Sequence, residues 1–192
     1  MEIESEKTQP PVSPLRYNSP GELFASMPKV RDFTRHRPRE DEGYIGYLNR
    51  LKASTTPEEV LTFTAFAAMP KMAIWWGYEC LRLMPEYLSD SDRELLKLVA
   101  DWTGYPDAEN RYRAMKVALW APKLSPVVFL ALGVGWSGGQ IAPNDPASPP
   151  VWRTPRAINS AVLSCLAQAD LNSRTRYLAQ FIKMTDTLFR IF

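Results

Sequence analysis

The 192-residue sequence has few side chains that carry out chemistry at neutral pH: it contains one histidine and two cysteines. His36 stands between Arg35 and Arg37, where we predict a solvated loop histidine without the fixed partner that a general base needs. Cys80 and Cys165 each lie in an apolar run, which favours two reduced core residues over a disulfide. One histidine is too few for a metal cluster. The sequence therefore predicts no catalytic residue, no metal site and no cofactor, and a protein that is not an enzyme.

Long apolar runs are also missing. A membrane span needs roughly 20 consecutive apolar residues, and the longest apolar stretch, residues 114–136, is interrupted by Lys116, Pro122, Lys123 and Pro126. The first residues, MEIESEKTQPPVSP, have neither the basic start nor the apolar centre of a secretory signal. We therefore expect a cytoplasmic protein that does not bind a membrane.

No stretch alternates apolar and polar residues between hairpin turns, so β-strand signals are absent. Apolar residues recur instead at spacings of three, four and seven, as in the series Tyr44, Tyr47, Leu48 and Leu51. We predict an all-α fold, with a single compact domain of about seven to nine helices over residues 19–192. A flexible leader is expected over residues 1–18, where proline and charge outweigh apolar residues.

The same pattern predicts helix starts and helix faces. Ser91 and Glu94 have the spacing of a capping box, and Ser173 is expected to cap the last helix. That helix carries an apolar stripe of Tyr177, Phe181, Met184, Leu188 and Phe192. Residues 71–84 are apolar on all sides, which predicts the buried centre of the domain. In RYRAMKVAL, residues 111–119, one face is expected to hold Tyr112, Met115 and Leu119, and the other Arg111, Arg113 and Lys116.

The stretch LALGVGWSGGQIAP, residues 130–143, has the spacing G-x-G-x-x-G of a dinucleotide-binding loop at Gly133, Gly135 and Gly138. Such a loop needs a strand before the glycines and a helix after them, whose N-terminus meets the pyrophosphate. Four prolines within residues 143–150 exclude that helix. We predict instead a helix that begins near Ser125, contains a buried Trp136 and ends at Gly138 or Gly139, one of which has a positive φ.

The formal net charge of +2, from 23 basic and 21 acidic residues, gives no general attraction to nucleic acid or to an anionic membrane. Carboxylates nevertheless predominate over residues 86–109, where Arg93 and Lys97 are the only bases. We predict that this acidic block binds a partner; a solvated helix surface is the alternative. The acidic block consists of Glu86, Asp90, Asp92, Glu94, Asp101, Asp107 and Glu109.

The stretch PVVFLALGVGWSGGQIAP, the proline-rich loop after it and RTPRAINSAVLSCLAQA resemble a bacterial helical family, the domain of unknown function 6931 family. Its motif W-S-G-G-x-x-A-P is matched by Trp136, Ser137, Gly138, Gly139, Ala142 and Pro143. RYRAMKVAL is similar to the R-R-A-M helix of that family. The resemblance covers roughly residues 70–192.

Members of that family resemble small accessory proteins encoded in type VI secretion clusters, beside spike proteins, adaptors and toxin effectors. The resemblance implies an immunity protein that binds and neutralises a cognate secreted toxin, and no enzymatic activity; the alternative is an adaptor or chaperone that loads an effector. The acidic block suits the basic cleft of a nuclease toxin. We expect a toxin or effector protein as partner and no nucleic acid, and a homo-oligomer is left open.

Overall fold

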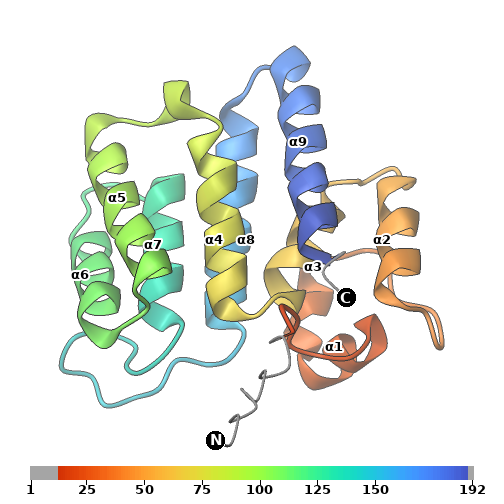
Figure 1. Cartoon of the computed structure of the whole chain (residues 1–192), viewed down its shortest axis with the longest axis horizontal. Helices are drawn as coiled ribbons and strands as arrows, with labels where there is room; N and C mark the ends of the chain where they lie inside the picture. Colours follow the sequence, from red (N-terminus) through yellow and green to blue (C-terminus); the bar gives the residue numbers. More distant parts are fainter. Residues whose placement is uncertain (1–12, 190–192) are drawn as a thin grey trace, which may run out of the picture.

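A computed structural model describes residues 13–189, which contain nine α-helices and two short 3₁₀-helices (Figure 1). The α-helices are α1 (Pro20–Ser26), α2 (Tyr44–Lys52), α3 (Glu59–Ala67), α4 (Pro70–Arg82), α5 (Asp90–Gly104), α6 (Ala108–Leu119), α7 (Pro126–Trp136), α8 (Arg153–Gln168) and α9 (Leu171–Phe189). The 3₁₀-helices are η1 (Pro28–Asp32) and η2 (Pro85–Tyr87). The prediction of an all-α fold with about seven to nine helices is confirmed.

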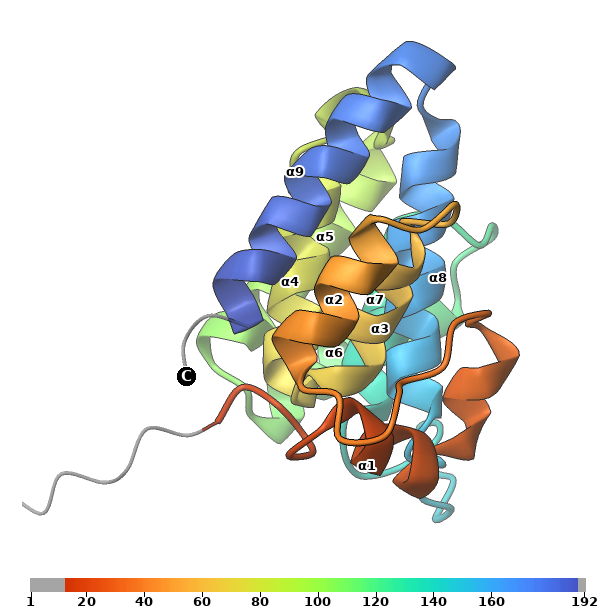
Figure 2. The ribbon, with the colours of Figure 1, turned by 90° about the vertical axis from the view of Figure 1, so that its right-hand side faces the viewer.

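Helices α4 and α8 pack against each other in the middle of the molecule (Figures 1 and 2). On one side of this pair lie α5, α6 and α7, with α7 packed on both α6 and α8; on the other lie α1, α2, α3 and α9. A continuous apolar core contains buried residues from every one of the α-helices named above. The two sides therefore belong to one compact body.

Helix α3 is the most deeply buried helix of the described chain. All nine of its residues are buried, because α1, α2, α8 and α9 surround it. Helix α4, in contrast, leaves the indole of Trp75 40% exposed. The prediction that residues 71–84 form the buried centre is therefore correct only in part: α4 lies in the middle and buries Trp76, Cys80 and Leu81, but α3 is buried more completely.

Two helix starts differ from their predicted caps. The capping box of α5 uses Ser89 and Asp92, whose backbone N–H groups each donate to the side chain of the other at 3.1 Å. At the start of α9, the Asp170 carboxylate accepts from the backbone of Ser173 at 2.9 Å, so Asp170 is the cap. The predicted stripe of α9 is buried at Tyr177, Phe181 and Leu188 and half-buried at Met184, and Phe192 lies outside the described residues.

Part of the predicted leader belongs to the folded body. Residues 1–12 lie outside the described chain, but residues 13–18 pack beside the end of α3. Leu15 is buried, and the backbone N–H of Arg16 donates to the Ala67 carbonyl at 2.9 Å. The Arg16 guanidinium donates to the next carbonyl, that of Ala68, at 3.0 Å. The end of a helix leaves such carbonyls without internal partners, and they hold this segment in place.

Cys80 and Cys165 are both buried and unpaired. Burial raises the pKa of both thiols, that of Cys165 to about 12. They therefore act as core residues, as predicted. Across residues 13–189, no helix combines the length and apolar character needed to cross a membrane.

Candidate functional site

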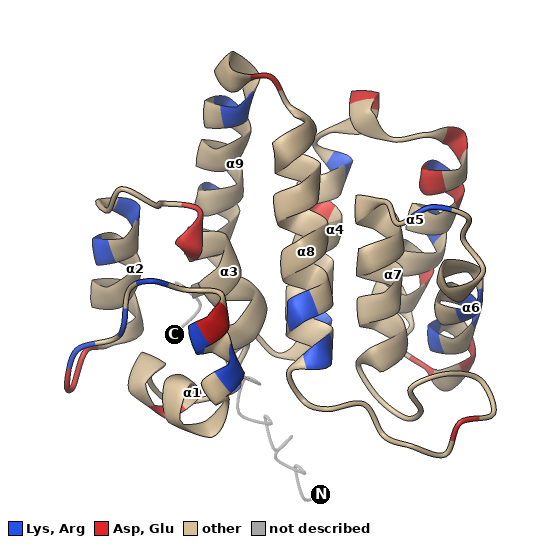
Figure 3. Ribbon diagram, turned by 180° about the vertical axis from the view of Figure 1, so that it is seen from behind, with Lys and Arg blue, Asp and Glu red and all other residues tan. Residues whose placement is uncertain are grey.

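The structure divides the predicted acidic block into two groups. Glu86, Asp90, Asp92 and Glu94 lie at η2 and the start of α5, whereas Asp107 and Glu109 lie at the start of α6. Asp90 and Asp101 are separated by roughly 16 Å along α5, from a rise of 1.5 Å per residue. Figure 3 shows acidic segments at both ends of the α5–α6 pair. The acidic block is therefore not one continuous patch.

Several carboxylates of the acidic block already have partners within the chain. Asp90 pairs with Arg93 at 2.9 Å and Glu94 pairs with Lys97 at 2.6 Å. Asp107 caps α6 by accepting the Asn110 N–H at 2.8 Å. Further partners are Ser89 for Asp92 and Tyr177 for Glu86. Asp101 and Glu109 are exposed and have no hydrogen bond or ion pair to another side chain among residues 13–189.

A cavity of about 870 Å³ opens between the start of α5, the second half of α6 and the start of α7. We call it the α5–α6–α7 groove. Its apolar lining comes from Leu95 and Leu98 of α5, Val117 of α6 and Val128 of α7. Trp120, just after α6, also lines the groove and is 82% exposed. Pockets of roughly 300 to 1,000 Å³ are typical of sites that receive a ligand or a partner's side chains.

Three cations border this apolar lining. Arg113, Lys116 and Lys123 are exposed, and none of them forms an ion pair with another residue of the described chain. The lining contains one carboxylate, Asp92, which accepts a hydrogen bond from the Ser125 hydroxyl. The α5–α6–α7 groove thus combines exposed apolar side chains with an excess of positive charge, three cations against one carboxylate.

The glycine-rich stretch forms a helix end. Ser125 caps α7 by accepting the Val128 N–H at 3.2 Å, α7 ends at Trp136, and Gly139 has a φ of 75°. These features confirm the predicted helix and the glycine with positive φ, but the helix ends at Trp136 with Ser137 as its cap, before the predicted Gly138 or Gly139. Trp136, however, is half-buried: its indole N–H donates to the Ile141 carbonyl at 2.9 Å, and the Arg153 guanidinium lies 4.7 Å from its ring centre. Two of the three fingerprint glycines, Gly133 and Gly135, lie inside the helix, so the stretch does not form a strand–turn–helix loop.

The W-S-G-G motif and the R-Y-R-A-M segment contact each other. Arg111 donates to the Gly135 carbonyl at 3.2 Å and also to the carbonyl of Gly138. A Cβ atom at Gly139 would stand 2.6 Å from the Arg111 guanidinium, and one at Gly135 would stand 2.6 Å from Met115. Ser137 donates to the Val134 carbonyl at 2.7 Å, and Ala142 and Pro143 lie half-buried in the loop that follows. The motif therefore joins α6 to α7.

The structure changes part of the predicted faces of α6. The residues buried against α7 are Ala114, Met115 and Ala118, and Arg111 reaches the end of α7. Tyr112 and Leu119, which were predicted to share the face of Met115, are exposed. A side chain at Gly139 would collide with the Arg111 guanidinium and one at Gly135 with Met115, so these two glycines allow both residues of α6 to approach.

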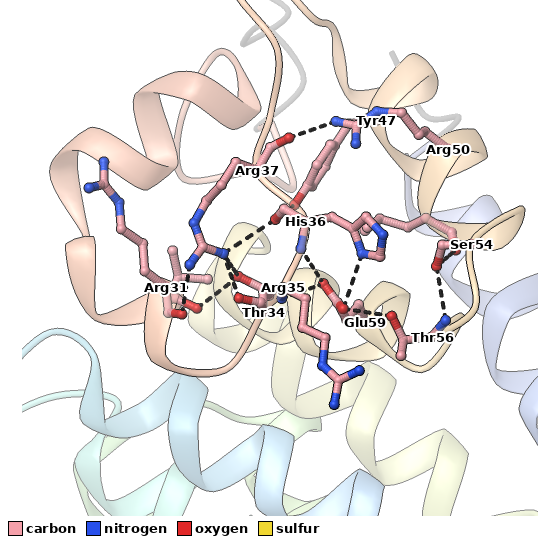
Figure 4. A network of polar contacts seen from close by, with 12 residues as sticks. Arg31, Thr34, Arg35, His36, Arg37, Tyr47, Arg50, Ser54, Thr56 and Glu59 are labelled. Carbon is pink, nitrogen blue, oxygen red and sulfur yellow. Dashed lines mark hydrogen bonds and ion pairs between the residues drawn. The ribbon is translucent and has the colours of Figure 1, made fainter.

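On the opposite side of the molecule, a buried carboxylate holds the segment after η1, residues 33–39, which we call the basic loop (Figure 4). Glu59, at the start of α3, accepts the backbone N–H groups of Arg35 at 2.9 Å and His36 at 3.1 Å. Its other oxygen accepts the Thr56 hydroxyl at 2.7 Å and lies 3.1 Å from His36 Nδ1. Tyr47 donates to the His36 carbonyl at 2.9 Å. Burial raises the pKa of Glu59, but these hydrogen bonds outweigh it, so the pKa lies below its ordinary value.

His36 is therefore not the solvated loop residue that the sequence predicted. Its side chain is 31% exposed, and its ring is oriented by a carboxylate, the arrangement of an acid–base pair. Among residues 13–189, no serine, threonine or cysteine side chain is hydrogen-bonded to the ring, and no group of three or more metal-binding side chains occurs. The spacing of Thr56 and Glu59 is typical of a capping box. This local signal does not predict that His36, 23 residues earlier in the sequence, contacts Glu59.

Comparisons with known proteins give one family match. Neither the curated proteins nor the solved structures give a match. The model of a family of unknown function (DUF6931) matches residues 47–189, which include the α5–α6–α7 groove, the W-S-G-G motif and Glu59. Because the match covers most of the sequence, this chain belongs to the DUF6931 family of unknown function.

Proposed function

We propose that this protein is a non-enzymatic cytoplasmic immunity protein, which binds and neutralises a cognate toxin of a type VI secretion system. The family resemblance described above supports the link to a type VI secretion system. The support for binding comes from the surface of the molecule.

The exposed apolar surface at the α5–α6–α7 groove carries the proposal. Trp120 is 82% exposed, and Leu124, close to it in the sequence, is 69% exposed. Monomeric proteins rarely expose large connected apolar patches unless a partner covers them. Tryptophan and arginine are also enriched among residues that dominate binding energy at protein interfaces. Trp120 and Arg113 both line the α5–α6–α7 groove, together with its apolar residues.

The acidic block is a second surface for the same role. Asp101 and Glu109 have no hydrogen bond or ion pair within the described chain, so they are available to a basic toxin surface. The other carboxylates serve caps and local pairs, which weakens their attraction for a partner. We therefore place the groove first and the acidic block second as the contact surface.

Co-expression with the secreted toxin encoded beside this gene tests the proposal. The wild-type protein should restore growth, and Trp120→Ala should abolish the rescue. Asp101→Lys combined with Glu109→Lys is the matched change in the acidic block, and it avoids the carboxylates that cap helices. Failure of the wild-type protein to rescue growth would contradict the immunity function. If rescue survives Trp120→Ala but is lost in the Asp101→Lys, Glu109→Lys double variant, the toxin binds the acidic block and not the groove.

An effector-loading adaptor or chaperone is the second candidate, and the concave shape of the α5–α6–α7 groove favours it. A groove receives a segment of its partner, which suits a carrier that must later release its cargo. Under this function, deletion of the gene should reduce secretion of the effector while leaving the producing cell viable.

A further inference from the structure

We propose that the α5–α6–α7 groove binds an amphipathic α-helix of its partner, with the apolar face of that helix on Leu98, Val117 and Trp120 and acidic residues along its flanks. This inference rests on the proposed binding function and specifies what the partner presents.

The choice of a helix follows from how proteins recognise segments of one another. Recognition by strand addition needs an open sheet edge, and within residues 13–189 the only extended pairing is the isolated bridge of Leu15 and Ala68. Recognition of polyproline segments needs a groove lined by several aromatic rings, and Trp120 is the only aromatic residue of the lining. An apolar trough between helices matches the mode in which a helix lays its apolar face into a groove.

The acidic character of the partner follows from charge. Arg113, Lys116 and Lys123 border the groove without ion pairs inside the described chain. Of the carboxylates at the start of α5, Asp90 pairs with Arg93 and Glu94 pairs with Lys97, so Asp92 is the one acidic residue of the lining, against three cations. A helix with glutamates beside its apolar stripe would place carboxylates against these cations, whereas a basic helix would meet like charge.

Trp120 is the expected anchor of this interface. It follows α6 directly, and its ring is almost fully exposed although the neighbouring Val117 and Ala121 line the cavity. A tryptophan at the edge of an apolar groove can close over a bound helix and bury a large area at low cost in conformational freedom.

The test uses two synthetic peptides of 20 residues and the full-length protein. Both peptides carry leucines in one helical stripe; the first has glutamates on the flanks, and the second has lysines at the same positions. Fluorescence anisotropy should show that the acidic peptide binds at least about tenfold more tightly than the basic one, and that its affinity falls as salt is raised. Equal affinities for the two peptides, or no binding of the acidic one, would overturn the inference.

Matched variants locate the binding site. Lys116→Glu should weaken the acidic peptide at least about fivefold, whereas Lys183→Glu, the same charge change on the exposed surface of α9, should not. Trp120→Ala should weaken it at least about tenfold, whereas Trp75→Ala on α4 should not. Circular dichroism checks that each variant is folded. Equal effects of the groove variants and their controls would contradict the assignment.

Two outcomes separate this inference from the proposed function. If the acidic peptide binds in the groove but the toxin is not neutralised, the immunity function fails and the inference stands. If the toxin is neutralised through Trp120 but the peptides are not distinguished, the inference fails and the function stands. A wild-type protein that is a dimer in light scattering, and becomes monomeric on Trp120→Ala, would show that a second copy of the chain occupies the groove, and this too would overturn the inference.

Discussion

Cations have different roles on the two sides of the central α4–α8 pair. On the side of α1, α2 and α3, the buried Glu59 holds the basic loop by its backbone, and Arg50 pairs with Glu42 at 2.6 Å. On the side of α5, α6 and α7, Lys116 and Lys123 border an apolar cavity and have no partner within the described chain. The first arrangement stabilises the fold, and the second leaves charge available to another molecule.

The difference shows that local charge in a sequence says little about where a partner binds. The basic loop is the more strongly charged segment, yet the backbone around Arg35 and His36 is fixed by Glu59. The groove has fewer charges, but they surround exposed apolar area. Substitutions on the α1–α3 side should therefore change stability, and substitutions in the groove should change binding.

The largest expected effect is on Glu59. Glu59→Gln replaces a buried carboxylate with a neutral amide, whose oxygen can still accept the two backbone N–H groups but whose NH₂ group cannot accept from Thr56 or His36. We expect the free energy of unfolding to fall by about 2–4 kcal/mol. Urea unfolding measures this, and Glu58→Gln at the neighbouring position is the control, because Glu58 makes no side-chain ion pair among residues 13–189. If Glu59→Gln and Glu58→Gln lose the same free energy of unfolding, the buried Glu59 does not stabilise the α1–α3 side, and the contrast with the groove fails.

Gly139→Ala should have the next largest effect. Gly139 has a φ of 75°, and its new Cβ would stand 2.6 Å from the Arg111 guanidinium. We expect a loss of about 1–3 kcal/mol in the free energy of unfolding, from backbone strain and displacement of Arg111. Gly138→Ala is the matched control, since a Cβ there meets nothing within 4 Å. Thermal unfolding of the two variants separates the cost of the positive φ and of the contact with Arg111 from the general effect of replacing a glycine by alanine.

The Glu42–Arg50 pair should contribute less, and its contribution should depend on pH. The hydrogen bond from Arg50 lowers the pKa of Glu42 to about 2. The folded state therefore binds fewer protons than the unfolded state, and the stability gained from the pair is present above the unfolded pKa of roughly 4.3 and lost as the pH falls toward 2. We expect about 1 kcal/mol or less, because the pair lies near the surface.

Unfolding of the wild-type protein and of Glu42→Gln, followed from pH 6 down to pH 2, measures this contribution. The two stabilities should differ at pH 6 and converge at the acidic end. Glu40→Gln on the exposed loop nearby should leave the pH dependence unchanged. A constant difference between wild type and Glu42→Gln across the range would show that the carboxylate does not titrate as described.

Trp120→Ala should have the smallest effect on stability and the largest on binding. Because the ring is 82% exposed, its removal takes little apolar area out of the core, and we expect a change below about 0.5 kcal/mol in the free energy of unfolding. Binding of the partner should be lost. A strong destabilisation by Trp120→Ala would show that the ring packs on the fold and would remove the contrast between the two sides.

The sequence by itself determined the helical architecture and much of the helix ends. Spacings such as Tyr47, Leu48 and Leu51 require one apolar face in a helix, and all three side chains are buried in α2. Ser125 sets the start of α7, and Gly139 takes a positive φ just after its end, through local rules that depend only on nearby residues. The family resemblance rested on such local signals in the same stretch.

The tertiary structure decided which charges are buried and which apolar residues are exposed. Glu59 has the sequence context of an ordinary first-turn carboxylate, and only the loop at His36, brought over it by the fold, makes it a buried anchor. Tyr112 and Leu119 were predicted to share the face of Met115, but only Met115 is buried against α7, and Arg111, predicted on the other face, reaches the end of α7. Burial depends on what lies opposite a residue in space, and that neighbour is set by the packing of the whole chain.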